Sequence, residues 1–395
     1  MKQRLNVLKS LVKKMNEPLS IVGFSSISAL GHLNEKNQNA YNSKSHALTR
    51  LDEFWQGKIP LETQKVIDQL RDKQSYKHLD KTALYAIHAA RQAMKMAHWN
   101  KNEIMGINIG CSRGPTEKLE EHHADFLQSE ITHIQASPST TAGNISSWLA
   151  QDLSTQGPMF SHSITCSSAF YAFLNGIAWI KSGMVEKFLV GGTEAPLTPF
   201  TIAQMKALKI YSKMDVDYPC RSLDFDKKEN TLVLGEGAGV ACIEKGRKNE
   251  ALCYIVGWGY GSEKISNSVS ISKNGISLQK AMLGATENHN LGSIDAIIMH
   301  APGTINGDKA EQKAIKSIFQ NKVPFCTSNK WKIGHTLGAS GMHSLDLALY
   351  MLNNNKVVEV PFIKTSKAPK QIKKILINTV GFGGNAASLL IQKAE

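Results

Sequence analysis

The sequence predicts a layered α/β fold in which helices cover mixed sheets. Three observations predict it. Short apolar runs alternate with helical patterns along the whole chain, each half contains a strand that ends at a reactive side chain before a helix, and no short-period repeat is visible. Buried strands that alternate with helices are typical of helix-covered sheets. At 395 residues, the chain has room for two domains or one large unit.

The first part of the chain predicts a strand, an insertion, a helix and a second strand. The helix opens at Asp80-Lys81, because the small and apolar residues that follow recur at helical spacing. In order, we expect a strand and turn at 18–31, a polar insertion with short helices at 32–75, this helix, a strand at 104–109, and a helix around Trp148-Leu149.

The segment around Cys166 predicts a strand, a tight turn, a cysteine and a buried helix. Residues 159–165 read as extended, and residues 169–180 are almost wholly apolar, which is typical of a helix buried on all sides. A thiol at a helix N-terminus meets unpaired N–H groups and the positive end of the helix dipole. We therefore expect the pKa of Cys166 to fall below its ordinary value of about 8.5. By itself, such a cysteine is more often a core residue.

The second part of the chain predicts further strands and two helices. We expect strands at 188–190, 232–243, 253–256, 294–299, 324–327 and 374–380, with helices at 310–319 and 339–352. His300 ends one of these strands, and Gly334-His335 precedes the second helix. We divide the chain into a basic N-terminal extension at 1–17, a first half at 18–247 and a second half at 248–395.

Composition and charge exclude several classes of protein. No stretch of about 18 uncharged apolar residues appears, so we expect no membrane span. No secretory signal is visible, and the six cysteines form no C-x-x-C pair, so we expect free thiols in the cytoplasm. The net charge of +13 favours an acidic partner. A small acidic carrier protein fits this charge, whereas no nucleic-acid-binding motif is present.

Six segments resemble, in order and spacing, the motifs of the β-ketoacyl-acyl-carrier-protein synthases, the condensing enzymes of the thiolase superfamily. The resemblance covers roughly residues 18–393, and the pair of histidines resembles the elongating Cys-His-His group. It implies a thiolase-like fold of two similar halves in αβαβα layers. The segments are Thr165-Cys166-Ser167-Ser168-Ala169, Gly191-Gly192-Thr193-Glu194-Ala195, Asp224-Phe225-Asp226 with 235–239, 300–311, Asn329-Lys330 with 334–339, and Gly381-Phe382-Gly383-Gly384.

The resemblance implies a β-ketoacyl synthase, an acyltransferase that performs a decarboxylative Claisen condensation. Cys166 would hold the growing acyl chain, and a malonyl thioester would lose CO2 to give the attacking carbanion. His300 and His335, both neutral, would donate to the developing enolate, since negative charge in a dry pocket needs donors. No cofactor is implied beyond the phosphopantetheine of an acyl carrier protein, which is the expected partner. We expect a homodimer, or a heterodimer with a related subunit.

The resemblance also implies supporting roles for the residues around this triad. Lys330 and Glu311 would assist the two histidines, with Asp308 behind them. The backbone N–H groups of Cys166 and Phe382 would form an oxyanion hole, with Phe382 and Gly383 gating acyl entry. Thr304 and Asn385 would bind pantetheine.

Some positions depart from the family pattern. Ala301-Pro302 replaces the usual Gly-Thr after the first histidine, and Asn385-Ala386 replaces Thr-Asn after the glycine turn. We therefore expect a specialised synthase, of polyketide or polyene synthesis, more than a housekeeping fatty-acid enzyme. Three alternatives remain: a non-catalytic, chain-length-factor-like subunit, a cysteine acyl-hydrolase, and a zinc site formed by Cys166 with both histidines. Because the sequence contains no short-range pair of metal ligands, we expect that no metal site is present.

Overall fold

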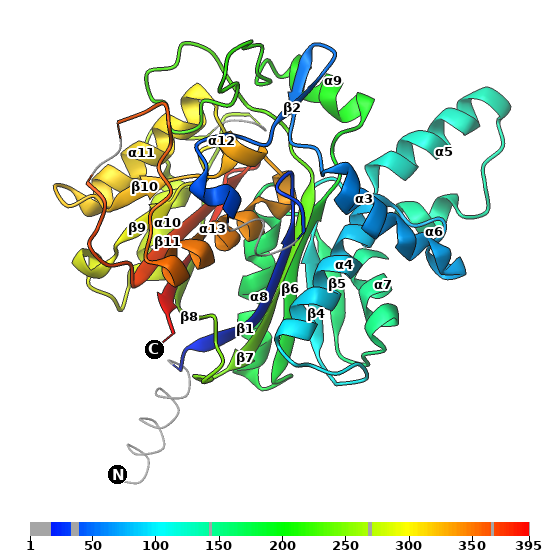
Figure 1. Ribbon diagram of the computed structural model, residues 1–395, viewed down its shortest axis with the longest axis horizontal. Helices are drawn as coiled ribbons and strands as arrows, with labels where there is room; N and C mark the ends of the chain where they lie inside the picture. Colours follow the sequence, from blue (N-terminus) through cyan, green and yellow to red (C-terminus); the bar gives the residue numbers. More distant parts are fainter. Residues whose placement is uncertain (1–16, 33–38, 142–143, 268–270, 365–366, 395) are drawn as a thin grey trace, which may run out of the picture.

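The computed structural model describes residues 17–32, 39–141, 144–267, 271–364 and 367–394 (Figure 1). Except for Glu17, the basic extension expected at 1–17 lies outside these residues. Within the described ranges, no helix is long and apolar enough to cross a membrane. All six cysteines lie in these ranges and are free thiols, as predicted.

The first half of the chain contributes five strands to one side of a ten-stranded mixed sheet. From the outer edge inwards their order is β5-β4-β6-β7-β1, with β5, β4 and β6 parallel and the remaining neighbours antiparallel. The strands are β1 (Leu19–Ile27), β4 (Gly106–Gly110), β5 (Met159–His162), β6 (Lys187–Glu194) and β7 (Gly237–Lys245).

The second half repeats the same arrangement. Its order from the outer edge inwards is β10-β9-β11-β12-β8, again with the first three strands parallel and the others antiparallel. The halves meet where β1 pairs with β8 over three residue pairs, Leu19–Ile21 against Cys253–Ile255. The strands are β8 (Cys253–Ser262), β9 (Ala296–Ile298), β10 (Phe325–Thr327), β11 (Lys374–Gly381) and β12 (Asn385–Lys393).

Helices complete five layers around the two halves of the sheet (Figure 1). The middle layer is α8 (Ser168–Ser182) packed on α13 (Ser340–Asn354), which also touch strands of both halves. The outer layers are α4 (Lys81–Met96) with α7 (Asn144–Leu153) on the first half, and α10 (Ile276–Thr286) with α11 (Ile305–Phe319) on the second. This is the αβαβα arrangement of two similar halves that the sequence predicts.

The middle layer holds the largest core cluster of the molecule. Phe170 and Phe173 of α8 and Leu345 of α13 are completely buried there, among apolar residues from strands of both halves. Burial of each such side chain stabilises the fold by roughly 1.5–3 kcal/mol. Because α8 begins just after Cys166 and α13 begins just after His335, this packing also brings the two segments together.

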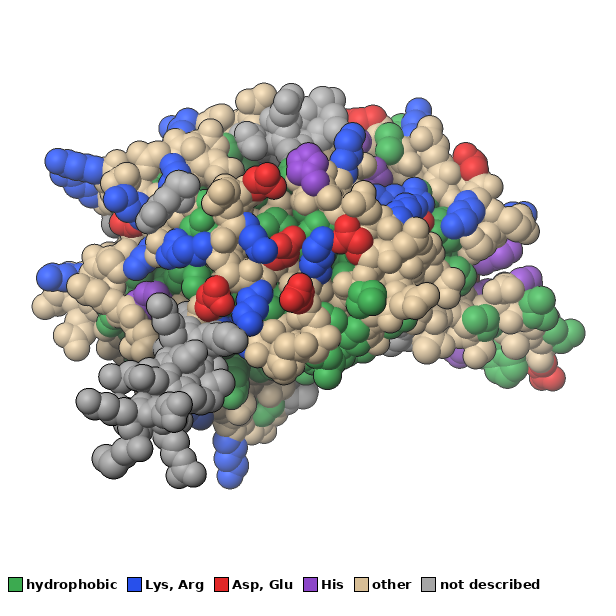
Figure 2. Space-filling model, turned by 90° about the horizontal axis from the view of Figure 1, so that it is seen from below, with side chains coloured by type: hydrophobic (Ala, Val, Ile, Leu, Met, Phe, Trp, Pro, Cys, Tyr) green, Lys and Arg blue, Asp and Glu red, His purple; other side chains and the backbone are tan. Residues whose placement is uncertain are grey.

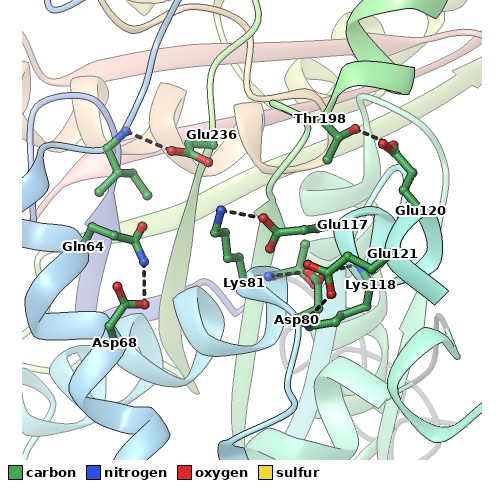
Figure 3. A network of polar contacts seen from close by, with 12 residues as sticks. Gln64, Asp68, Asp80, Lys81, Glu117, Lys118, Glu120, Glu121, Thr198 and Glu236 are labelled. Carbon is green, nitrogen blue, oxygen red and sulfur yellow. Dashed lines mark hydrogen bonds and ion pairs between the residues drawn. The ribbon is translucent and has the colours of Figure 1, made fainter. Parts of the chain in front are cut away.

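The helix α5 (Thr116–Ser129) projects from the body, and a polar network fixes its base (Figures 1 and 3). Lys81 of α4 lies 2.7 Å from Glu117, and the backbone N–H of Lys118 donates to Asp80, which caps α4. On the other side, the hydroxyl of Thr198 donates to Glu120 at 2.6 Å. The helix is therefore attached to two neighbouring elements through its first turns.

Shorter elements complete the described part of the chain. They are β2 (Thr49–Leu51), β3 (Phe54–Gln56), α3 (Leu61–Asp68), α6 (Ala136–Thr140), α9 (Pro199–Ala207), α12 (Lys330–Ile333), and the 3-10 turns Gln69–Asp72, Gln74–Tyr76, Leu291–Ser293 (η3) and Leu337–Ala339 (η4).

The structure differs from the sequence predictions at several places. The strand predicted at 232–243 becomes β7 only from Gly237, because Leu232, Leu234 and Gly235 form isolated bridges to other segments. The strand predicted at 374–380 is not the last, because Gly381–Gly384 turns the chain back into β12. The helix predicted to be buried on all sides, α8, leaves Ala178 exposed. When a helix is apolar on every face, its sequence does not show which face is covered by other elements and which is exposed to solvent. The boundary between 247 and 248, in the connection from β7 to β8, stays a proposal.

Candidate active site

Cys166 lies in a strained turn between β5 and α8. The N–H groups of Ser167 and Ser168 donate to the carbonyls of Ile164 and Thr165, at 3.1 and 3.2 Å. Thr165 adopts φ of 48°, in the left-handed region that a β-branched side chain rarely enters. Such a residue costs roughly 1–3 kcal/mol and marks a backbone that its surroundings hold in place. The turn therefore fixes the direction of the Cys166 side chain.

The structure brings Cys166, His300 and His335 together, although they are far apart in the sequence. One potential ligand atom from each side chain, the sulfur and a nitrogen of each ring, lies within 4.8 Å of the other two, and all three residues are buried. The two imidazole rings meet edge to face, with centroids 5.0 Å apart and an interplanar angle of 84°. These three predicted residues therefore meet at one buried site, which is called the pocket below.

His300 is held by a carboxylate from α11. The side chain of Glu311 accepts the backbone N–H of His300 at 2.9 Å and that of Ala301 at 2.8 Å. Asn378 of β11 donates to the same carboxylate at 3.1 Å. Ala301 has φ of 28°, so the residue beside this histidine is also forced into the left-handed region.

His335 is held through its backbone by the segment that precedes β7. Its N–H donates to the carbonyl of Val233 at 2.7 Å, and its carbonyl accepts from Gly235 at 3.0 Å. Leu337, two residues further on, has φ of 40°. Each of the three grouped side chains therefore has a non-glycine residue in the left-handed region one or two positions away.

Lys330 places a buried positive charge beside the two imidazoles. Its side chain is 1% exposed, and its Nζ has no hydrogen-bond partner among the described residues. Burial and then the charge of Lys330 lower the pKa of His300 and of His335 well below 6.5. Burial also lowers the pKa of Lys330 itself, against the attraction of Glu311. Both histidines are therefore neutral at neutral pH, as the sequence analysis expects.

The expected low pKa of Cys166 is wrong. Burial raises it to about 12, the negative charge of Glu194 adds to this effect, and Lys330 opposes it. Loss of hydration outweighs the favourable position before α8, because a sulfur anion away from water loses most of its solvation. The resting side chain is therefore a thiol.

The turn after β11 lies against the nucleophile. The hydroxyl of Thr165 donates to the carbonyl of Phe382 at 3.1 Å, and the side chain of Asn385 donates to the same carbonyl at 2.8 Å. A Cβ on Gly381 would lie 2.0 Å from the Thr165 hydroxyl, so this close approach requires glycine. Gly383 has φ of 93°, which a glycine adopts readily. Phe382 and Gly383 therefore lie at the entrance to the Cys166 turn.

Thr304 and Asp308 lie at the start of α11 and have structural contacts. The Thr304 hydroxyl caps the helix by accepting from Gly307 at 3.2 Å. Asp308 is completely buried, forms an ion pair of 2.7 Å with Lys227, and accepts the N–H of Gly303. Asp308 thus shapes the loop after His300 and does not reach the three grouped side chains by any contact in the described structure.

Sequence reasoning assigned no role to two residues that the structure places beside the pocket. Asn378 orients Glu311, and Glu194 binds backbone groups on both sides of the pocket. Glu194 carries a visible signal, since it ends a strand inside a recognised motif. Asn378 carries none, because an asparagine in a strand does not reveal its partner.

Two family models and several relatives match this chain. The model for the β-ketoacyl synthase N-terminal domain matches residues 21–249, and the model for the C-terminal domain matches residues 252–363. A 3-oxoacyl-[acyl-carrier-protein] synthase 2 of Staphylococcus aureus is 26% identical over 356 residues, 82% of this chain and 84% of that protein. A 3-oxoacyl-[acyl-carrier-protein] synthase 1 of Buchnera aphidicola is 26% identical over 405 residues, 95% of this chain and 97% of that protein.

Solved structures agree with the fold. The ishigamide ketosynthase/chain length factor superposes with a TM-score of 0.83 at 19% identity, covering 96% of this chain and all of that one. A β-ketoacyl synthase from Burkholderia phymatum gives 0.83 at 20% identity with the same coverage. The two domain models, together spanning most of the chain, carry the assignment beyond fold: the chain belongs to the β-ketoacyl synthase family of condensing enzymes.

Proposed function

We propose that this ketosynthase joins an acyl chain held on Cys166 to a malonyl unit. The Cys166 sulfur attacks the carbonyl of an acyl-carrier thioester, its proton passes to the departing carrier thiol, and an acyl-cysteine remains. A malonyl-carrier thioester then loses CO2, and the resulting enolate carbon attacks the acyl-cysteine carbonyl. A carbon–carbon bond forms, the carbon–sulfur bond to Cys166 breaks, and the sulfur takes up a proton from solvent.

One observation carries the proposal: a buried thiol shares its pocket with two neutral imidazoles. Decarboxylation moves negative charge onto the malonyl thioester oxygen, which needs hydrogen-bond donors in a pocket without water. A neutral imidazole can donate its N–H in a hydrogen bond without transferring the proton to the enolate, so His300 and His335 suit this task. A hydrolase would need a single base oriented by a carboxylate or amide, and neither ring is bonded to one in the described structure.

We assign supporting roles to the neighbouring residues. Lys330 adds its charge to the effect of burial in keeping the imidazoles neutral. Glu311 fixes the His300 loop, and Asp308 supports that loop from behind. The N–H groups of Cys166 and Phe382 would form the oxyanion hole, since the turn that carries Phe382 and Gly383 is bonded to Thr165.

Pantetheine recognition is the remaining assignment. We assign it to Thr304 and Asn385. The hydroxyl of Thr304 accepts a bond within its own helix but is still free to donate. The Oδ1 atom of Asn385 has no hydrogen-bond partner among the described residues.

A metal centre is the weaker interpretation of the same three side chains. Their spacing would suit a cation, but the buried ammonium of Lys330 lies close enough to lower the pKa values of all three. A second positive charge there would be repelled in a medium of low polarity. We therefore assign Cys166, His300 and His335 to condensation and not to zinc.

We infer that the carrier of both substrates is an acyl carrier protein in the cytoplasm, bound by a dimer of this chain or by its heterodimer with a related subunit. The names of the curated relatives include this carrier, and one similar structure is titled as a ketosynthase in complex with its acyl-carrier protein. The net charge of +13 suits an acidic partner. On the face in Figure 2, basic side chains alternate with acidic ones, which does not suit nucleic acid.

We propose a specialised pathway, polyketide or polyene synthesis, in place of housekeeping fatty-acid synthesis. The support is the departure from the family pattern at Ala301-Pro302 and Asn385-Ala386, both at the edge of the pocket. Complementation of a strain that lacks its elongating synthase tests this proposal. Full rescue by this protein would refute it.

A chain-length-factor-like subunit is the second candidate, since some similar structures are titled as pairs of ketosynthase and chain length factor. The complete set of Cys166, His300 and His335 argues against a non-catalytic role. Incubation with acyl- and malonyl-carrier thioesters decides between them. We expect a ketoacyl product and an acyl adduct on Cys166, detected by intact mass. Absence of both, with the Cys166→Ala variant giving the same result, would favour the second candidate.

A further inference from the structure

Glu194 is a buried carboxylate near the pocket that the proposed reaction does not use. It is the last residue of β6 and is completely buried. Its side chain accepts the N–H groups of Ser112, Arg113 and Gly338, at 2.8, 3.1 and 2.9 Å, and the thiol of Cys111 at 3.4 Å. Every partner is a donor, so the ionised carboxylate is the form that this arrangement satisfies. Burial raises the pKa of Glu194 to about 7 against these hydrogen bonds, so the side chain is fully charged only above neutral pH.

These partners come from both halves of the molecule. Ser112 and Arg113 follow β4 in the first half, whereas Gly338 lies in η4, three residues after His335. A Cβ on Gly338 would lie 2.5 Å from the Ser112 nitrogen and 2.8 Å from Glu194 Oε2, so the contact is tightly packed. Glu194 thereby fixes the segment of His335 on the half that carries Cys166.

The same device serves the other histidine. Glu311 accepts the N–H of His300 and of the next residue, and Glu194 accepts an N–H just beyond His335. Each histidine segment thus has one buried carboxylate as its anchor. A hydrogen bond to a charged acceptor is stronger than one between neutral groups, so each carboxylate helps to select one backbone position among several.

We propose that Glu194 is a positioning residue that ties the His335 segment to the half of the molecule carrying the nucleophile, and so sets the geometry of the decarboxylating step. The proposal rests on the proposed condensation. Its specific content is the step affected: acyl transfer to Cys166 does not depend on His335 in the scheme above, but decarboxylation does.

The test replaces Glu194 by Gln, which keeps the size but turns an NH2 group toward partners that are all donors. We expect acyl loading of Cys166, followed by intact mass, to stay within about threefold of wild type. Formation of ketoacyl product from loaded enzyme should fall about 100-fold, the size of effect that a misplacement of about 1 Å produces. An equal loss in both steps, or undiminished product formation, would overturn the proposal.

Two further variants separate position from general damage. Glu194→Asp keeps the charge and should recover part of the second step. Asp152→Asn removes another buried carboxylate, paired with Arg91 far from the pocket, and should lower the melting temperature without changing the ratio of the two steps. If Glu194→Gln fails to fold, the Asp variant carries the test: a loss confined to the second step supports the proposal, and an equal loss refutes it.

Alkylation of Cys166 by iodoacetamide gives a readout that needs no substrate. The charges and titratable groups around the sulfur are Glu194, Lys330, Arg113, His300 and His335. Removal of the Glu194 charge should speed alkylation at a given pH, and Glu194→Asp should leave it nearly unchanged. Equal acceleration in both variants would indicate simple exposure and contradict the described anchoring. If wild type forms no ketoacyl product, the proposed function fails, and this assay still judges the anchoring.

Discussion

At the scale of single residues, two buried lysines of α12, Lys330 and Lys332, have different roles. Lys332 donates to three backbone carbonyls, of Ala40, Ser43 and Ser45. Lys330 has no hydrogen-bond partner among the described residues and instead lies beside the pocket. Burial of an ammonium group without hydrogen-bond partners costs free energy of folding. We therefore infer that Lys330 acts on the pocket through its charge.

Replacement of Lys330 by Met should slow alkylation of Cys166 by up to about tenfold at pH 7, where Lys330 is still mostly charged although burial lowers its pKa. A rise of one unit in the pKa of Cys166 lowers the population of thiolate tenfold. The sign follows from the charge of Lys330, which lowers the pKa of the sulfur. Rates measured by mass spectrometry against pH check it. Lys332→Met is the matched control: it should destabilise the protein without slowing alkylation. Faster alkylation in Lys330→Met would contradict this assignment.

His343 of α13 should make the protein sensitive to acid. Burial lowers its pKa from 6.5 to about 4, while its ring bonds Thr336 and the carbonyl of Ile27. Between these values the unfolded chain binds the proton and the folded one does not, so stability falls as pH falls through that window. From pH 7 to pH 5 this one group should cost about 2 kcal/mol.

The measurement is the free energy of unfolding in urea at pH 7 and pH 5, for wild type and His343→Gln. Buried carboxylates such as Asp346, whose pKa is raised to about 6 by burial, act in the opposite direction. Only the difference between the two proteins therefore reports His343. Identical pH dependence in both would show that the ring does not stay neutral in the fold.

At the scale of elements, Asp80 joins two helices. One carboxylate oxygen accepts the N–H and hydroxyl of Thr82 at the start of α4, and the other accepts the N–H of Lys118 in α5 (Figure 3). Asp80→Ala should destabilise the protein by about 1–3 kcal/mol, through a lost cap and unpaired buried donors. Lys81→Ala, which removes a half-buried ion pair and no helix cap, should cost about 1 kcal/mol or less. Equal losses in denaturant titrations would refute this ranking.

Most strands and the four longest helices, α4, α8, α11 and α13, are predictable from the sequence, because apolar runs and helical spacing record burial directly. The helix at Asp80 and the strand ending at His300 are examples. The strand β12 was missed because the glycines before it read as the end of the last element, although they form a hairpin turn. Helix α5 was missed because its outer part is exposed, so no apolar face records its packing.

The site was predictable to a similar degree and for a different reason. The motifs identify Cys166, His300 and His335, since the sequence names each reactive residue type directly. The pKa of Cys166 was mispredicted because it depends on burial and on Glu194, which only the folded chain brings near. The bonds of Glu194 to Gly338 and of Asn378 to Glu311 likewise join distant segments, and no local pattern encodes them.

At the scale of the whole molecule, the two ends of the described chain lie close together. Leu19 pairs with Ile255 and Lys393 with Cys253, so the start of β1 and the end of β12 flank the same residues at the start of β8. The loop between β7 and β8 is exposed at residues 247–250. Joining residues 393 and 17 by a short linker and opening the chain in this loop should preserve the fold.

This circular permutant should unfold in one transition, since α8 and α13 share a core drawn from both halves. Coincident unfolding curves from far-UV circular dichroism and tryptophan fluorescence would check it. A permutant that is soluble yet unfolds in two separate steps would show that the halves are independent, contrary to the shared middle layer.

The left-handed residues Thr165, Ala301 and Leu337 have a consequence for engineering. A screen for heat resistance alone would favour glycine at these sites, because glycine relieves the steric cost of a positive φ. Each gain would free a backbone segment that now aims one reactive group. The most heat-resistant variants from such a screen should therefore be poorer catalysts. Selection for turnover should instead retain the non-glycine residues at these three positions.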